Sequence, residues 1–253
     1  MKYLLSSAVL ALAVGGSTCA GAVEITLIAP GGIRAAVNQM LPDFERKTGN
    51  TVKATFGSGG GTKAQVVKGD AFDVPIVQVP YEDVIKSGHV VVASETPLAN
   101  VSVGLAVRTG APKPDISTAD AVKKLLLGAK SISYPNAANG AAAGVSFDET
   151  LKKLGIAEEM KPKIKIAQGG AGAMALLAKG EIEYGLTFVS EIITEPGVEA
   201  VGPLPRDIST PTFLSAFLSA DTKNAEAAKA LIAFLSSPEA AAVYKARGML
   251  PGR

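Results

Sequence analysis

Short β-branched runs alternate with helical patterns along almost the whole chain, and this alternation constrains the fold more than any other feature. The segment Glu24–Pro30 (EITLIAP) is typical of a buried strand. In the segment after it, five apolar residues share one face at helical spacing: Ile33, Val37, Met40, Leu41 and Phe44. Strands and helices that alternate in this way predict an α/β fold with parallel-type central sheets and flanking helices.

The alternation occurs in two sets, which predicts two lobes. We expect residues 1–22 to form a signal peptide, residues 23–100 the first part of lobe 1, residues 101–195 lobe 2, and residues 196–253 a return to lobe 1. The two passages between the lobes would form a crossover hinge. A chain of 253 residues is long enough for two lobes of about 100–150 residues each.

The N-terminus has the pattern of a secretory signal. Lys2 precedes the apolar run Tyr3–Val14, and a small-x-small cleavage pattern ends at Ala22. The run is shorter than the roughly 20 residues that a membrane-spanning helix needs. We therefore predict cleavage after Ala22 and a periplasmic protein. The only cysteine, Cys19, falls within this signal. Lipidation of Cys19 is the alternative, although the residue three positions before it is not apolar.

Composition and charge argue against several classes of function. The net charge is +2, there is no basic run, and tryptophan is absent, so we expect no nucleic-acid partner. The only histidine, His89, is expected to have a surface or capping role, and no metal-ligand spacing is present. Two carboxylate pairs, Asp70 with Asp73 and Glu181 with Glu183, read as solvated surface. Without an acid–base pair or a Ser–His–Asp arrangement, we expect neither an enzyme nor a cofactor.

The glycine run Gly57–Gly61 resembles a phosphate-binding loop but fails its spacing, because Thr62 stands where a Walker loop needs a glycine. Thr62 and Gln65 match a capping box, which predicts a helix that begins there and ends at Gly69. The loop can still bind another anion, since glycines let the backbone approach a ligand and a helix N-terminus presents free N–H groups. A tight turn without a ligand is the alternative.

Three further strand-to-helix junctions are rich in small residues: Ala29–Arg34, Ala138–Gly144 and Gln168–Gly172. Each follows the carboxyl end of a predicted strand, where open α/β sheets bind ligands. Arg34 can hold a carboxylate or an oxyanion through two parallel hydrogen bonds, and a solvated helix start is its alternative. The four junctions together predict an anion site.

At three segments the chain resembles the substrate-binding proteins of ABC importers, in particular their molybdate-binding branch: Phe44–Gly60 (FERKTGNTVKATFGSGG), Val67–Pro80 (VKGDAFDVPIVQVP) and Lys223–Pro251 (KNAEAAKALIAFLSSPEAAAVYKARGMLP). The resemblance covers nearly the whole mature chain. It implies the type II periplasmic-binding-protein fold, in which two α/β lobes joined by a crossover hinge close on a small oxyanion. It also implies a monomer that delivers its ligand to an ABC permease in the membrane.

The resemblance also implies which residues bind the ligand. Ser58 matches a serine of the family's second loop, Ala143 matches a backbone amide donor, and Gly170 falls near another such donor. Gly31 and Gly32 fall where the first loop usually carries serines. With their neighbours, the expected ligand-binding residues are Gly31, Gly32, Ile33, Arg34, Ser58, Gly59, Gly60, Ala142, Ala143, Gly169, Gly170 and Phe188.

Phe188 falls where the molybdate binders carry a tyrosine whose hydroxyl touches the oxyanion. Loss of that hydroxyl leaves a dehydrated oxyanion short of donors, and each unpaired acceptor costs about 1–3 kcal/mol. We therefore expect an organic acid, with Arg34 on its carboxylate and Phe188 against its carbon atoms. The alternatives are a molybdate- or tungstate-type oxyanion, and, from another class, a nicotinamide-dependent enzyme. The latter would use the Gly-x-Gly-x-x-Ala match at Gly170, Gly172 and Ala175.

Overall fold

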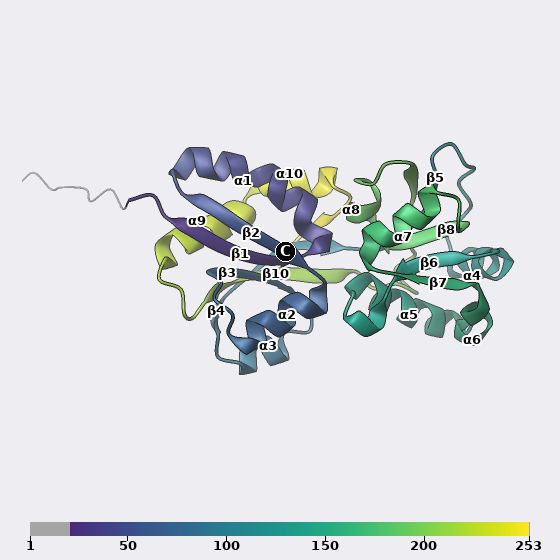
Figure 1. Cartoon of the computed structure of the whole chain (residues 1–253), viewed down its shortest axis with the longest axis horizontal. Helices are drawn as coiled ribbons and strands as arrows, with labels where there is room; N and C mark the ends of the chain where they lie inside the picture. Colours follow the sequence, from purple (N-terminus) through teal and green to yellow (C-terminus); the bar gives the residue numbers. More distant parts are fainter. Residues whose placement is uncertain (1–20, 253) are drawn as a thin grey trace, which may run out of the picture.

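The computed structural model describes residues 21–252, which fold into two lobes that lie side by side (Figure 1). Each lobe is built around one sheet that carries helices on both faces, so the two-lobed α/β fold is as predicted. Residues 1–20, which include Cys19 and most of the expected signal peptide, lie outside the described residues. Cleavage after Ala22 therefore stays a prediction.

Lobe 1 contains a six-stranded sheet in the order β11-β4-β10-β3-β1-β2. Its strands are β1 (Glu24–Pro30), β2 (Thr51–Gly57), β3 (Val74–Gln78), β4 (Val90–Val101), β10 (Thr212–Ser219) and β11 (Leu250–Pro251). Strands β2, β1 and β3 are parallel, and β10, β4 and β11 join through antiparallel pairs. Because Pro30 is paired with Gly57, the loops after β1 and β2 begin at the same edge of the sheet.

Lobe 2 contains a five-stranded sheet in the order β7-β6-β8-β5-β9. Its strands are β5 (Val103–Arg108), β6 (Ile132–Pro135), β7 (Ile164–Ala167), β8 (Tyr184–Phe188) and β9 (Val198–Pro203). Strands β7, β6 and β8 are parallel, whereas β5 is antiparallel to both of its neighbours. Both sheets are therefore mixed, and the parallel half of each one carries the strand-to-helix junctions.

The chain passes between the lobes twice. Strands β4 and β5 are separated by a single residue, Ser102, and residues 204–211 connect β9 back to β10. Since β4 leaves lobe 1 and β10 returns to it, the two strands run in opposite directions, and they pair antiparallel in the sheet. The antiparallel half of the first sheet follows from this exchange.

Helices cover both faces of the first sheet. They are α1 (Arg34–Thr48), α9 (Ala225–Leu235) and α10 (Pro238–Ala246) on one face, and α2 (Gly59–Lys68) and α3 (Glu82–Lys86) on the other (Figure 1). The side chains of β1 alternate between these layers: Ile25, Leu27 and Ala29 join the core under α1, whereas Ile28 joins Val66 of α2 in the opposite core. Strand periodicity thus explains why β1 reads as apolar throughout.

The second sheet is covered in the same way. Its helices are α4 (Ala119–Gly128), α5 (Ala142–Leu154) and α6 (Ala157–Met160), which share one core, and α7 (Gly169–Ala178) and α8 (Val189–Ile192), which share another. Short 3-10 turns occur at Gly31–Ile33, Ala137–Asn139 and Lys161–Lys163. Along β5, Leu105 and Val107 face the first of these cores and Ala106 faces the second.

Helix α2 begins earlier than the sequence predicted. Its N-cap is Ser58, whose Oγ accepts a hydrogen bond of 3.0 Å from the Gly61 N–H, and Thr62 is fully buried inside the helix. The capping-box prediction at Thr62 was therefore wrong at the N-terminal end. The predicted end is confirmed, since the C-cap Gly69 has a φ of 83°, which favours glycine. The earlier start brings the first amides of α2 to the end of β2.

The prediction that Asp73 lies on the solvated surface was also wrong, because Asp73 is buried. Asp73 is only 8% exposed. Its carboxylate accepts hydrogen bonds from the Thr26 N–H (2.8 Å), the Thr26 hydroxyl (2.9 Å) and the Thr222 hydroxyl (2.5 Å). Burial alone would raise the pKa of Asp73, but the hydrogen bonds from Thr222 and Thr26 outweigh it and hold that pKa below its ordinary value. The carboxylate thus ties β1 to the segment before α9.

Candidate functional site

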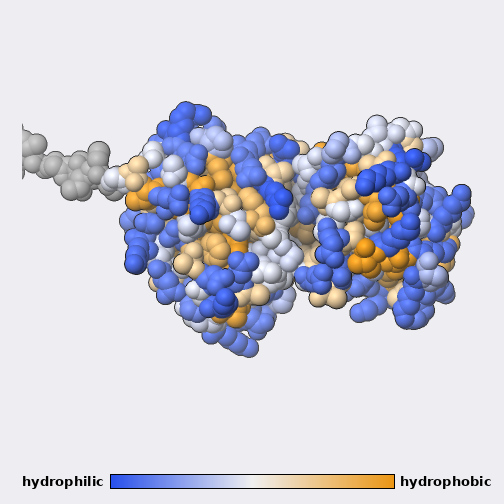
Figure 2. Space-filling view, in the orientation of Figure 1, coloured by the Kyte–Doolittle hydropathy of each residue, from blue (hydrophilic) through white to orange (hydrophobic). Residues whose placement is uncertain are grey.

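A cleft of about 580 Å³ lies between the two lobes. Lobe 1 contributes the ends of β1, β2 and β3 with the starts of α1 and α2, and lobe 2 contributes the ends of β6 and β8 with the starts of α5, α7 and α8. Figure 2 shows the surface narrowing between the lobes, beside residues of intermediate hydropathy on the lobe 1 side. The cleft therefore lies at the carboxyl ends of parallel strands in both sheets, where α/β proteins bind ligands.

The structure brings nearly all of the predicted site residues together. Ten of the predicted residues line the cleft: Gly31, Gly32, Arg34, Ser58, Gly59, Ala142, Ala143, Gly169, Gly170 and Phe188. Ile33 does not line it, because its side chain is fully buried in the core under α1. Gly60 also lies outside the lining. Its N–H donates a hydrogen bond of 2.9 Å to the carbonyl oxygen of Gly140 in lobe 2, so this amide is not free for a ligand.

Helix N-termini face the cleft from both lobes. Helices α2, α5 and α7 begin at Gly59, Ala142 and Gly169, all of which line it. The first amides of a helix have no partner within the helix and carry partial positive charge, so they attract anions. The Ser58 hydroxyl is partly occupied, since its oxygen caps α2 and lies 3.4 Å from the carbonyl oxygen of Asn139.

Arg34 is the only cation in the cleft lining among residues 21–252. It is the first residue of α1 and is exposed, and its guanidinium carbon lies 5.4 Å from the centre of the Phe56 ring. This cation–π contact fixes the side chain at the lobe 1 wall without using its hydrogen-bond donors. The donors remain available to a carboxylate.

Phe188 joins the two lobes at the base of the cleft. It ends β8, is 5% exposed, and packs on Gly32, where an added Cβ would lie 2.9 Å from Phe188 Cδ2. Next to it, the Ser190 hydroxyl donates a hydrogen bond of 2.7 Å to the carbonyl oxygen of Gly32. The first loop of lobe 1 thus rests directly on the β8–α8 junction of lobe 2, and Gly32 has little room for a side chain there.

Glu191 is the most important residue that the sequence reasoning did not identify. Its carboxylate lies between the loops of both lobes, because a Cβ added at Gly31 would lie 3.1 Å from Oε1 and one added at Gly170 would overlap Oε2. The Thr187 hydroxyl donates a hydrogen bond to Oε2. Burial raises the pKa of Glu191, while the Thr187 hydroxyl, the Phe188 N–H and the charge of Arg34 partly oppose that rise.

Gln78 is the second such residue. It ends β3, and its side-chain amide occupies the space that a Cβ at Gly59 would need, so the amide packs directly on the backbone at the start of α2. The Gln78 Oε1 atom is buried and has no hydrogen-bond partner in the protein. A buried acceptor without a partner is costly, so this amide is a candidate to contact a ligand in the cleft.

The profile of a known family, described as bacterial extracellular solute-binding protein, matches residues 25–250 of this chain. The chain belongs to that family. The molybdate-binding protein ModA of Azotobacter vinelandii is 30% identical to this solute-binding protein over 98% of each chain. An aconitate isomerase of a Pseudomonas species is 28% identical, over 90% of this chain and 87% of its own.

Solved structures show the same fold. The periplasmic molybdate-binding protein of Azotobacter vinelandii superposes with a TM-score of 0.73 at 21% identity, over 89% of this solute-binding protein and 98% of that chain. The resemblance to the molybdate-binding branch that the sequence predicted is therefore confirmed.

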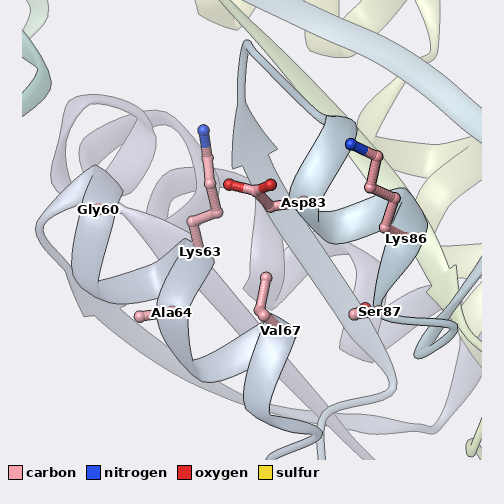
Figure 3. Close-up of a pocket in the computed structure, with 7 residues that line it drawn as sticks. All are labelled: Gly60, Lys63, Ala64, Val67, Asp83, Lys86 and Ser87. Atoms are coloured by element: carbon pink, nitrogen blue, oxygen red, sulfur yellow. The ribbon is translucent and has the colours of Figure 1, made fainter.

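A second depression lies on the surface of lobe 1, between α2 and α3 (Figure 3). Lys63 and Asp83 face each other across it, with Val67 beneath them. The Lys63 ammonium donates a hydrogen bond of 2.6 Å to the Pro80 carbonyl, and burial lowers the pKa of Lys63. Only one lobe of this solute-binding protein lines the depression, and its central amine already has partners, so the interlobe cleft is the better ligand site.

Within residues 21–252, no helix is long and apolar enough to cross a membrane, and no group of three or more His, Cys, Asp or Glu side chains is placed to hold a metal ion.

The spacing of Glu191 is the signal that could have identified it. It lies three residues after Phe188, the N-cap of α8, and a glutamate at that position turns back toward the end of the strand. No comparable local signal marks Gln78.

Proposed function

We propose that this protein captures a small organic acid in the interlobe cleft and delivers it to an ABC permease. The observation that carries the proposal is the combination of Arg34 and Phe188 with helix N-termini from both lobes. The guanidinium and the amides suit a carboxylate, and the phenyl ring suits carbon atoms. Capture would follow from closure of the two lobes about the crossover hinge.

A fully ionised tetraoxyanion fits this lining less well. Phe188, Gly31 and Gly32 offer no hydroxyl donors, and Glu191 and Glu195 add negative charge to the lining. A cleft of about 580 Å³ is also within the usual size range of sites for small organic molecules. A molybdate- or tungstate-type ligand remains the competing proposal, supported by the relative named as a molybdate-binding protein.

The remaining parts of the proposal concern where the protein acts. We infer a periplasmic monomer whose signal peptide is removed after Ala22, in line with the description of its family as extracellular. Closed protein would dock on the permease, or on a receptor if the protein serves in sensing. The description of the family as solute-binding does not support the nicotinamide-dependent alternative.

A thermal-shift panel on the mature protein tests the ligand class. Di- and tricarboxylates are compared with molybdate, tungstate and sulfate at equal concentrations. A ligand present at one hundred times its dissociation constant stabilises by about 2.7 kcal/mol, which corresponds to roughly 5–10 °C for a chain of this size. Stabilisation by an organic acid supports the proposal. Stabilisation by molybdate or tungstate alone would overturn it.

One observation favours a second candidate, an isomerase that moves a proton within an unsaturated polycarboxylate. Glu191 is a desolvated carboxyl group in the cleft, and a relative is named an aconitate isomerase. The Glu191 carboxylate would take a proton from a C–H group beside a carboxylate of the ligand. The freed electron pair would form a new double bond, the old one would open, and its far carbon would receive the same proton from Glu191.

Proton NMR in D₂O separates binding from this activity. Incubation of cis- or trans-aconitate with an isomerase gives the other isomer, and Glu191→Gln abolishes this conversion. Unchanged spectra in the presence of protein that binds the acid would leave binding alone as the function.

A further inference from the structure

The cleft offers hydrogen-bond acceptors as well as donors, which a site for a simple anion does not need. Among the lining residues, Glu191 and Glu195 carry carboxylates and Gln78 carries a buried Oε1 without a partner. Arg34 is the one cation that opposes these two carboxylates in the lining of the described chain. With both glutamates ionised, the lining is therefore net negative.

The position of Glu191 makes this charge matter to any ligand. Its carboxylate lies between Gly31 of lobe 1 and Gly170 of lobe 2, at the level of the loops that supply the amide donors. The Thr187 hydroxyl donates a hydrogen bond to Oε2, whereas Oε1 lies next to Gly31 of lobe 1. A ligand that reaches the amides at Gly31 and Gly170 also meets this carboxylate.

A ligand that only accepts hydrogen bonds would be repelled at this point. Molybdate, sulfate and succinate are acceptors only, so each would place negative oxygens beside Glu191. A ligand with its own donor would reverse the effect, because an O–H or N–H that points at a carboxylate makes a charge-assisted hydrogen bond. The same donor group could also serve the orphaned oxygen of Gln78.

We infer that the ligand of this cleft carries a hydrogen-bond donor, a hydroxyl or an ammonium group, beside its carboxylate, and that Glu191 accepts that hydrogen bond. This inference rests on the proposed function, since it specifies the class of organic acid. In this arrangement Arg34 and the helix N-termini hold the carboxylate end, and Glu191 selects the group next to it. Glu191 then determines specificity by rejecting acids that lack the donor.

Isothermal titration with matched acids tests the inference. Succinate, malate and aspartate share one four-carbon dicarboxylate skeleton and differ by a hydrogen atom, a hydroxyl or an ammonium group at one carbon. Tricarballylate and citrate form a second pair that differs by one hydroxyl. We expect the wild-type protein to bind malate or aspartate, or citrate, at least tenfold more tightly than the matched acid without the donor. The member that binds more tightly distinguishes hydroxyl from ammonium.

Two variants assign the effect to Glu191. Glu191→Gln keeps the shape of the side chain but removes its charge, so the preference should fall below about threefold while succinate and tricarballylate bind as well or better. Glu195→Gln makes the same change of charge in the same cleft, and it should change the affinity of all acids together and keep the preference.

The outcomes separate the two proposals. Equal binding of the matched acids to the wild-type protein, or a preference that survives in Glu191→Gln, would overturn the inference and leave organic-acid binding intact. If none of the acids binds, the proposed function itself fails and the inference fails with it.

Discussion

The N–H of Gly60 donates a hydrogen bond of 2.9 Å to the carbonyl oxygen of Gly140, and these two glycines belong to different lobes. A Cβ added to either glycine would lie 2.9 Å from the Cα of the other. The lobes therefore meet backbone to backbone beside the cleft, and no side chain separates them. If the lobes open about the crossover hinge, as the proposed capture requires, this contact breaks, so we infer that it stabilises the closed state.

Gly60→Ala should hold the lobes apart. The new Cβ would contact the Gly140 backbone, which cannot move as a flexible side chain can, so the closed state loses stability relative to the open one. Small-angle scattering should give a larger radius of gyration than for the wild-type protein. Gly172→Ala is the matched control, because it is also helical and its Cβ would make only an ordinary contact of 3.6 Å with Ala167. A radius equal to that of the control would contradict this role.

Asp73→Asn should destabilise the fold by about 2–3 kcal/mol, measured by urea unfolding. The substitution replaces one acceptor oxygen by an NH₂ group, which then faces donors on Thr26 or Thr222. Asp70→Asn is the control, because Asp70 makes only a 3.5 Å ion pair with the exposed Lys68 and should change stability by less than about 0.5 kcal/mol. Equal losses in the two variants would refute the structural role of Asp73.

The pH dependence of stability should also report Asp73. Because hydrogen bonds hold its folded-state pKa below the ordinary value of about 3.9, the carboxylate contributes stability above that pH. The contribution is lost as the pH falls through the folded-state pKa. Asp73→Asn should therefore differ from wild type most at neutral pH, and the difference should shrink in acid.

Glu191→Gln should behave in the opposite way. Since burial raises the folded-state pKa of Glu191, the ionised group costs stability once the pH rises through that pKa. The variant should melt at a higher temperature than wild type at pH 7–8, and the gain should vanish below the ordinary glutamate pKa of about 4.3. Melting curves from pH 4 to 8 measure this difference, and a gain that does not depend on pH would exclude desolvation as its cause.

Phe188→Tyr should bring back an oxyanion donor. The hydroxyl would supply the donor that the resemblance to the molybdate-binding branch implies at this position, and a hydrogen bond to a charged acceptor contributes about 1.5–3 kcal/mol. Affinity for molybdate should therefore rise about 10- to 100-fold. Phe188→Leu, which has neither ring nor hydroxyl, should show no such gain. Molybdate affinity that stays unchanged in Phe188→Tyr would mean that this position does not select the ligand.

Arg34→Gln should weaken the binding of every carboxylate in the thermal-shift panel by about tenfold or more, because one neutral amide cannot replace a bidentate guanidinium. Stability without ligand should change little, since Arg34 is exposed and packs on the face of Phe56. Arg46→Gln controls for the loss of charge. Arg46 lies on the same helix but pairs with Asp43 on the surface, and its loss should leave binding unaffected.

Local periodicity was enough to predict much of this architecture. The predicted strand Glu24–Pro30 coincides with β1, and the apolar face predicted for the next segment is the buried face of α1, with Val37, Met40, Leu41 and Phe44. Each has a strong repeat and clear ends. The position of the cleft followed from them, because strand ends and glycine-rich helix starts recur at the same edge of a parallel sheet.

The parts that sequence did not predict depend on contacts between distant segments. Nothing local distinguishes Asp73 from Asp70, because the partners of Asp73 lie 47 and 149 residues away. Ser58 and Thr62 are both of residue types that favour the N-cap position, and burial of Thr62 inside the helix decides between them. Gln78 lies in the cleft beside Gly59, which belongs to another segment of the chain, so no local pattern marks it.

The place of β10 in the first sheet has a consequence for how the chain acquires its structure. β10 lies between β4 and β3, although more than one hundred residues, including all of lobe 2, separate it from both in sequence. During synthesis, all five strands of the lobe 2 sheet are made before β10. Lobe 2 can therefore fold while β3 and β4 still lack the strand that lies between them. Lobe 1 needs residues 212–219 to complete its sheet, so β3 and β4 present open edges until those residues are made, and open strand edges favour misassembly.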